Sequence, residues 1–135
     1  MFTPRKTVGQ MVQEAKTRIE NLTPEQLQAE LASGETQLID IRDLRERQRD
    51  GWIPGAVNMS RGMLEFWLDP TSNYYRGVVD PEKRIVLYCA GGGRSALAAD
   101  TLQEMGFPKV AHLESGFGGW ARAGLPVERE PKAAN

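Results

Sequence analysis

One segment indicates the fold class most clearly: Arg84-Ile-Val-Leu-Tyr-Cys89-Ala-Gly-Gly-Gly-Arg94-Ser95-Ala-Leu-Ala-Ala99. Its apolar first part predicts a strand over residues 85–88, covered on both faces as in a parallel sheet. Three glycines follow the cysteine, and the residues after them predict a helix over 95–105. A strand that turns through a glycine-rich loop into a helix is typical of an α/β domain.

The rest of the chain repeats this alternation of short strands and helices. Strands are predicted over residues 37–41, 56–58 and 109–113, and helices over 23–34, 43–50, 61–68 and 118–123. Thr23-Pro24-Glu25-Gln26 combines an N-cap residue, a proline at the first helical position and a glutamine that can complete a capping box. The pattern predicts an α/β domain with a mostly parallel sheet, in which ligands bind beyond the carboxyl ends of the strands.

The first part of the chain has apolar residues at helical spacing, from Val8 to Leu22. They predict an N-terminal amphipathic helix of about four turns within residues 1–22. Its apolar face must be covered, and we favour burial against the chain's own domain, as a monomer, over a helix-mediated dimer. The domain itself is expected over residues 23–128, with a polar C-terminal tail at 129–135.

The composition is that of one ordinary globular domain, with 135 residues, 40% of them hydrophobic, and a net charge of −1. This balance predicts no affinity for nucleic acid or for anionic membranes. No apolar run is long enough to span a bilayer, and no secretory signal is recognised, so we expect a cytoplasmic location. A single cysteine and a single histidine, His112, exclude an internal disulfide and a Cys/His zinc site within a monomer. We expect neither a metal nor a cofactor.

Cys89 lies where the predicted strand ends, and it is the candidate nucleophile. The N–H groups of the glycine loop can turn toward its sulfur, and the start of the next helix adds partial positive charge. Such surroundings stabilise a thiolate, a persulfide or a bound oxyanion. Three consecutive glycines are best explained by a backbone that curls tightly around a ligand. The alternative is that Cys89 is a small buried hydrophobic residue.

Three segments resemble, in order and spacing, the motifs of the single-domain rhodanese family. The first is Leu38-Ile-Asp-Ile-Arg-Asp43, with Glu46 and Gly51-Trp-Ile-Pro-Gly-Ala56 after it. The second is Cys89-Ala-Gly-Gly-Gly-Arg-Ser95. The third is Leu113-Glu-Ser-Gly-Phe-Gly-Gly-Trp120, followed by Gly124-Leu-Pro-Val127. The resemblance covers about residues 22–127. It implies a rhodanese-like three-layer domain with a five-stranded, mostly parallel sheet flanked by helices.

The resemblance also implies a sulfurtransferase activity. Cys89 would take a sulfane sulfur from thiosulfate, mercaptopyruvate or a low-molecular-weight persulfide, and would pass it as a persulfide to a nucleophilic acceptor, a small molecule or a protein. The donor would be bound by the loop residues Ala90, Gly91, Gly92, Gly93, Arg94 and Ser95. Ala90 and Gly91 carry no charge, whereas thiosulfate-cleaving members have basic side chains at these positions.

Two other functions are compatible with the same residues. Phosphatases and arsenate reductases also use a loop with a cysteine and an arginine. The loop from Cys89 through Arg94 has six residues, one fewer than in the related dual-specificity phosphatases. The other alternative is a binding module that carries or senses sulfur without fast turnover.

Four further interpretations concern residues around the loop. We expect Arg94 to bind the oxyanion of the donor rather than a carboxylate of the fold. The charges of Asp40, Arg42 and Glu46 predict an ion-pair network that supports the loop, and His112 is interpreted as a surface or half-buried structural histidine. At Gly92, a β-branched side chain is expected to fold nearly normally and to impair the reaction by crowding the ligand.

Overall fold

Five parallel strands form the centre of the protein, in the order β1-β5-β4-β2-β3. The computed structural model describes residues 1–131. The strands are β1 (Glu20–Leu22), β2 (Gln37–Asp40), β3 (Val57–Asn58), β4 (Ile85–Tyr88) and β5 (Val110–Leu113). The expected five-stranded parallel sheet is therefore confirmed. Because β4 is the middle strand, the residue that follows it lies at the centre of the carboxyl edge of the sheet.

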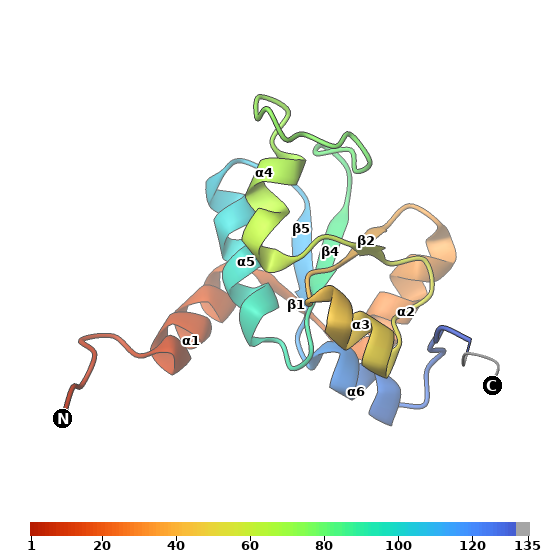
Figure 1. Ribbon diagram of the computed structural model, residues 1–135, viewed down its shortest axis with the longest axis horizontal. Helices are drawn as coiled ribbons and strands as arrows, with labels where there is room; N and C mark the ends of the chain where they lie inside the picture. The colour runs from red at the N-terminus through yellow and green to blue at the C-terminus, as the bar shows by residue number, and fades with distance from the viewer. Residues whose placement is uncertain (132–135) are drawn as a thin grey trace.

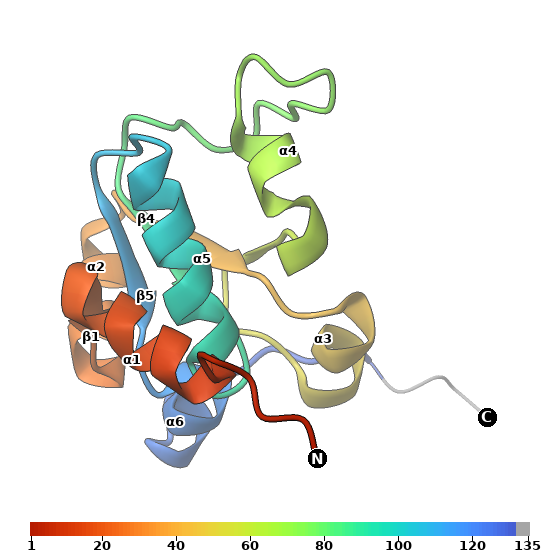
Figure 2. The ribbon, with the colours of Figure 1, turned by 90° about the vertical axis from the view of Figure 1, so that its left-hand side faces the viewer.

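Helices cover both faces of this sheet (Figures 1 and 2). One face carries α1 (Val8–Arg18), α5 (Gly93–Glu104) and α4 (Leu64–Leu68), which a 3₁₀ turn (Arg61–Met63) precedes. The other face carries α2 (Pro24–Ser33) and α6 (Gly116–Arg122). The remaining helix, α3 (Leu44–Asp50), follows β2 at the same end of the molecule as α6 (Figure 1).

The hydrophobic core is divided by the sheet into two parts, and β4 contributes to both. Ile85, Leu87 and Cys89 point toward α1, α4 and α5, whereas Val86 and Tyr88 point toward α2 and α6. Every residue of β4 is buried, as the continuous apolar run of this strand predicts. The alternation places the side chain of Cys89 on the α5 side of the sheet.

The N-terminal helix is shorter than the sequence predicts. α1 ends at Arg18, and residues 20–22, expected to belong to the helix, form the edge strand β1, which pairs with β5. Pairing with β5 satisfies the backbone groups of β1, and Leu22 is buried in the core beside α2. α1 itself packs against α5, with Ala15 fully buried and a bidentate ion pair between Arg18 and Asp100 at 2.9 and 2.7 Å.

The other elements lie close to their predicted positions. The capping box of Thr23 and Gln26 is present, and Gly34 ends α2 in the left-handed conformation. The chain after α6 is attached to the domain at Glu128, whose backbone forms two 2.9 Å hydrogen bonds with Trp52. The division of the chain at residue 23 and the monomeric state stay predictions. Of the predicted tail at 129–135, residues 132–135 lie outside the described residues.

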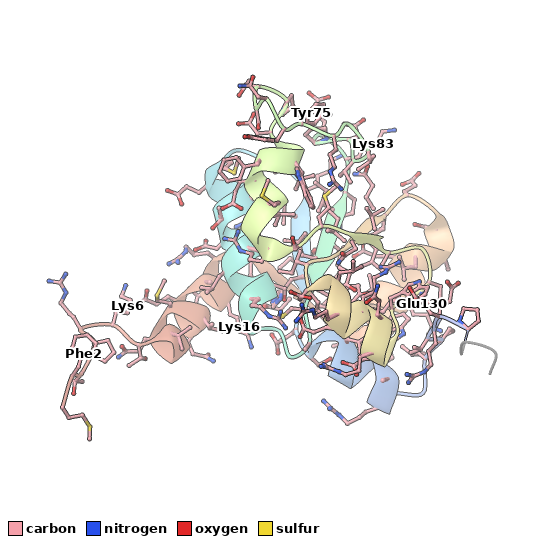
Figure 3. All side chains as sticks on the ribbon, viewed as in Figure 1. Phe2, Lys6, Lys16, Tyr75, Lys83 and Glu130 are labelled. Atoms are coloured by element: carbon pink, nitrogen blue, oxygen red, sulfur yellow. The ribbon has the colours of Figure 1, made fainter. Side chains whose placement is uncertain are left out.

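The side chains labelled in Figure 3 mark one end of the sheet and the start of the chain. Tyr75 and Lys83 lie at the end of the molecule opposite α6, where β4 begins. Phe2 and Lys6 lie on an N-terminal arm that extends away from the sheet. Within residues 1–131, no helix has the length and apolar character needed to cross a membrane.

Candidate active site

Cys89 follows directly after β4, and its side chain is only 1% exposed. Its sulfur accepts hydrogen bonds from the backbone N–H of Gly92 at 3.1 Å and of Ser95 at 3.4 Å. The first amides of α5 have no acceptor inside the helix, so they carry partial positive charge toward the loop. Two backbone donors, one from the N-cap residue Gly92 and one from the first turn of α5, therefore face the sulfur.

The start of α6 fixes the conformation of the cysteine loop, which comprises residues 89–95. Phe117 donates its N–H to the carbonyl oxygen of Cys89 at 2.8 Å, and Gly118 donates to that of Ala90 at 3.0 Å. These bonds turn the loop carbonyls toward α6, away from the sulfur. Gly116 permits this contact, because it has a φ of +67° and a Cβ there would lie 2.5 Å from the oxygen of Ala90.

Gly92 is required by backbone packing. It has a φ of +100°, and a Cβ at this position would overlap the carbonyl oxygen of Glu114, in the turn between β5 and α6. The expectation that a β-branched side chain at Gly92 folds nearly normally is therefore wrong, because the clash is with the fold itself. Gly91 differs from it, since a Cβ there meets no atom within 4 Å.

Arg94 is paired with a carboxylate of the fold. Its guanidinium donates to both oxygens of Glu46, at 2.8 and 2.9 Å. This pair lowers the pKa of Glu46, which also accepts the backbone N–H of Asp43 in the capping box of α3. In this structure Arg94 thus links the start of α5 to the start of α3, and its role in donor binding stays a prediction. Ala90 and Gly91 follow Cys89 before the helix, and Gly93 is the first residue of α5.

The charge cluster expected at the end of β2 is divided into two ion pairs. Asp40 and Arg42 form a fully buried bidentate pair at 2.9 and 2.8 Å, while Glu46 pairs with Arg94. The Tyr88 hydroxyl donates to Asp40 at 3.1 Å, and the guanidinium of Arg42 lies 4.4 Å from the centre of the Phe117 ring. The buried pair therefore contacts residues of both β4 and α6.

His112 is a residue of the site that the sequence interpretation missed. It is completely buried, not at the surface or half-buried, and its Nδ1 lies 2.8 Å from the hydroxyl oxygen of Ser95. β5 lies between β1 and β4, and His112 is on the same face of β5 as the core residue Val110. The two-residue spacing from Val110 could have predicted this burial from the sequence, because residues two apart in a strand share a face. Burial lowers the pKa of His112 to about 4.

The described residues contain no cluster of three or more His, Cys, Asp or Glu side chains that could hold a metal ion. The chemistry available at the carboxyl end of β4 is thus that of one sulfur, the loop amides and a buried Ser95–His112 contact. A sulfur in these surroundings is suited to nucleophilic attack and to holding a charged adduct.

Comparison with known proteins gives relatives along nearly the whole chain. The chain is 29% identical over 110 residues to a sulfurtransferase of Allochromatium vinosum, covering 81% of this chain and 94% of that protein. It is similar to a polysulfide-sulfur transferase, a homodimer from Wolinella succinogenes, with 32% identity, a TM-score of 0.72, and coverage of 93% and 89% of the two chains. It is also similar to a Rhodopseudomonas palustris protein of unknown function, described as a possible tyrosine phosphatase. There the identity is 48%, the TM-score 0.89 and the coverage 95% and 98%.

A sequence model of the rhodanese-like domain matches residues 23–123, which include all of α2 to α6 and the complete cysteine loop. The match agrees with the three-layer architecture and with the position of Cys89 after the central strand. The chain therefore belongs to the family of rhodanese-like domains.

Proposed function

We propose that this protein is a sulfurtransferase that carries a sulfane sulfur as a persulfide on Cys89. The observation that supports this most directly is the pair of backbone N–H groups, from Gly92 and Ser95, that face the sulfur of Cys89 at the start of α5. The same arrangement stabilises negative charge on the thiolate before the reaction. The free amides of the first turn of α5 then lie near the outer sulfur of the persulfide.

The reaction consists of two nucleophilic substitutions at sulfur. The thiolate of Cys89 attacks the outer sulfur of the donor, the sulfur–sulfur bond of the donor breaks, and the leaving group departs with the bonding electrons. A nucleophilic acceptor, a small molecule or a protein, then attacks the outer sulfur of the persulfide. The bond between the two sulfurs breaks, and the thiolate of Cys89 is regenerated.

We propose a polysulfide or a low-molecular-weight persulfide as the donor, in preference to thiosulfate. Residues 90–93 carry no charged side chain, and Arg94 is engaged with Glu46. The loop therefore offers backbone amides, which suit a single terminal sulfur, rather than a free cation that would hold the sulfonate group of thiosulfate. The similarity to the polysulfide-sulfur transferase of Wolinella succinogenes supports this choice.

The proposal is tested by measuring the intact mass of the protein after incubation with each donor. Polysulfide or glutathione persulfide is expected to add the mass of one sulfur atom, which cyanide removes as thiocyanate. Thiosulfate and mercaptopyruvate are expected to load the protein more slowly. Turnover then separates an enzyme from a sulfur-binding module: a protein that loads with sulfur but forms thiocyanate only once is a module. Absence of any sulfur adduct with all four donors would refute the proposal.

Phosphatase activity is expected to be absent, despite the similarity to a protein described as a possible tyrosine phosphatase. A tetrahedral phosphate needs a wider ring of donors than one sulfur atom, and donor distances must stay near about 3 Å. The loop has six residues from Cys89 through Arg94, and the arginine is held by Glu46. We expect no hydrolysis of p-nitrophenyl phosphate and no effect of low vanadate concentrations on sulfur transfer. Hydrolysis that depends on Cys89 would favour the phosphatase.

A further inference from the structure

Cys89 is the first member of a chain of hydrogen-bonding side chains that leads from the loop to the edge of the sheet. Its sulfur lies 3.6 Å from the hydroxyl oxygen of Ser95, which lies 2.8 Å from Nδ1 of His112. On the other side of the imidazole ring, Nε2 lies 2.7 Å from the side-chain oxygen of Asn21. Cys89, Ser95 and His112 are all buried, so this chain is shielded from bulk water. It joins β4, α5, β5 and β1.

The orientation of Asn21 determines the positions of the protons. Its amide nitrogen donates to the carbonyl oxygens of Lys16 at 3.0 Å and Ile19 at 3.2 Å, so its oxygen faces His112. An amide oxygen can only accept, and Nε2 of His112 must therefore carry a hydrogen. In the neutral ring Nδ1 is then the acceptor. Ser95 donates its one hydroxyl hydrogen to Nδ1 at 2.8 Å, the shorter of its two contacts with acceptors, rather than to the carbonyl oxygen of Gly92 at 3.3 Å. The Ser95 oxygen is left to accept the S–H of Cys89.

We propose that Ser95 and His112 take the proton of Cys89 when its thiol ionises, and that Asn21 is the positioning residue that keeps Nδ1 ready to receive it. The S–H bond breaks, its electron pair stays on sulfur, and the proton binds to the Ser95 oxygen. The original hydroxyl proton of Ser95 moves to the lone pair of Nδ1. The products are a thiolate and an imidazolium, with no change in the total number of protons. The inference rests on the proposed function, because it concerns the thiolate that attacks the donor.

The charges around the chain make the imidazolium dependent on the thiolate. Burial and the ammonium group of Lys16, from α1, lower the pKa of His112 to about 4. Whenever Cys89 is a thiol, the imidazole ring of His112 is therefore neutral at pH 7. Arg94, at the start of α5, is a cation that interacts electrostatically with Cys89. The guanidinium of Arg94 is itself hydrogen-bonded to the carboxylate of Glu46. β1 contributes the neutral amide of Asn21. The thiolate of Cys89 is thus the group that stabilises the protonated form of His112.

This arrangement predicts an unusual dependence of thiol reactivity on pH. The thiolate fraction of a lone thiol falls about tenfold for each pH unit below the pKa of that thiol. The thiolate–imidazolium pair contains as many protons as the thiol–imidazole pair, so the ratio of these two states does not change with pH. A reactivity that depends on the pair must therefore become constant at low pH until the pair takes up a further proton.

The test is the rate of alkylation of Cys89, the single cysteine, by iodoacetamide between about pH 5 and pH 9. For the wild-type protein we expect the rate to level off at low pH. His112→Asn leaves Ser95 a neutral polar partner but cannot hold a proton. Its rate is expected to fall about tenfold per pH unit throughout, and Ser95→Ala is expected to behave in the same way. At about pH 5, the wild type should react at least about tenfold faster than either variant.

Thr101→Ala is the matched control, because it removes a hydroxyl of α5 that donates to Leu97 and does not contact Cys89. Its profile is expected to follow the wild type. Ser95→Ala deletes a single oxygen atom and keeps the test possible if His112→Asn does not fold. A wild-type rate that itself falls tenfold per unit, or a His112→Asn profile that levels off, would overturn the inference. Alkylation involves no sulfur donor, so failure of sulfur loading refutes the proposed function separately from this result.

Discussion

Cys89→Ser is expected to abolish sulfur uptake and thiocyanate formation completely. The chain has no other cysteine, so no second thiol can accept sulfur. Serine has nearly the shape of cysteine and can accept the N–H of Gly92 in place of the sulfur. Its hydroxyl is not ionised at neutral pH and cannot form a persulfide. Intact-mass measurement after incubation with polysulfide, together with a thiocyanate assay, checks this result.

The variant also shows whether the loss is chemical or structural. Cys89→Ser is expected to retain the melting temperature of the wild type to within a few degrees, because the buried volume and the loop contacts change little. A folded variant without sulfur uptake identifies Cys89 as the sulfur carrier. Turnover at the wild-type rate would contradict the proposed mechanism, because another group would then have to carry the sulfur.

Gly92→Ala is expected to cause the largest loss of stability from a single methyl group in this protein. The left-handed backbone at position 92 costs a residue with a Cβ roughly 1–2 kcal/mol, and the overlap with the Glu114 carbonyl adds to this cost. We expect a fall in the free energy of unfolding of at least about 2 kcal/mol and a fall in Tm of roughly 5–10 °C. Thermal and denaturant unfolding measure both quantities.

Gly91→Ala is the matched control for stability. It adds the same methyl group one residue earlier, where a Cβ meets no neighbouring atom within 4 Å. Its free energy of unfolding is expected to stay within about 0.5 kcal/mol of the wild type. Equal melting temperatures for Gly92→Ala and the wild type would mean that the contact between the cysteine loop and Glu114 does not constrain the fold.

The local pattern of the sequence predicted the strand–loop–helix unit around Cys89. The apolar run before the cysteine, the three glycines and the helix formers after them are neighbours in the chain, and their effects act over a few residues. The same holds for the helix after Thr23, whose cap and end depend on Thr23, Gln26 and Gly34 alone. The resemblance of three ordered motifs to a known family supplied the number of strands.

β1 shows where this local reasoning fails. Residues 19–22 continue the helical spacing of the apolar side chains, yet the helix ends before them. Residues 20–22 pair with β5, about ninety residues later in the sequence. The advantage of the strand comes from hydrogen bonds to β5 and from burial of Leu22 beside α2. Neither the pairing with β5 nor the packing against α2 can be recognised from the few residues around position 20.

Sequence patterns were sufficient to place one cysteine at the end of a buried strand, before a helix N-terminus, and the resemblance of three motifs placed it in a rhodanese-like domain. The surroundings of that cysteine follow from tertiary contacts: Glu114 against Gly92, Glu46 as the partner of Arg94, and His112 in contact with Ser95. These contacts join elements that are distant in the chain. Steric overlap, ion pairing and burial act over a few ångströms in space, so they are fixed only when the sheet and its helices have packed together.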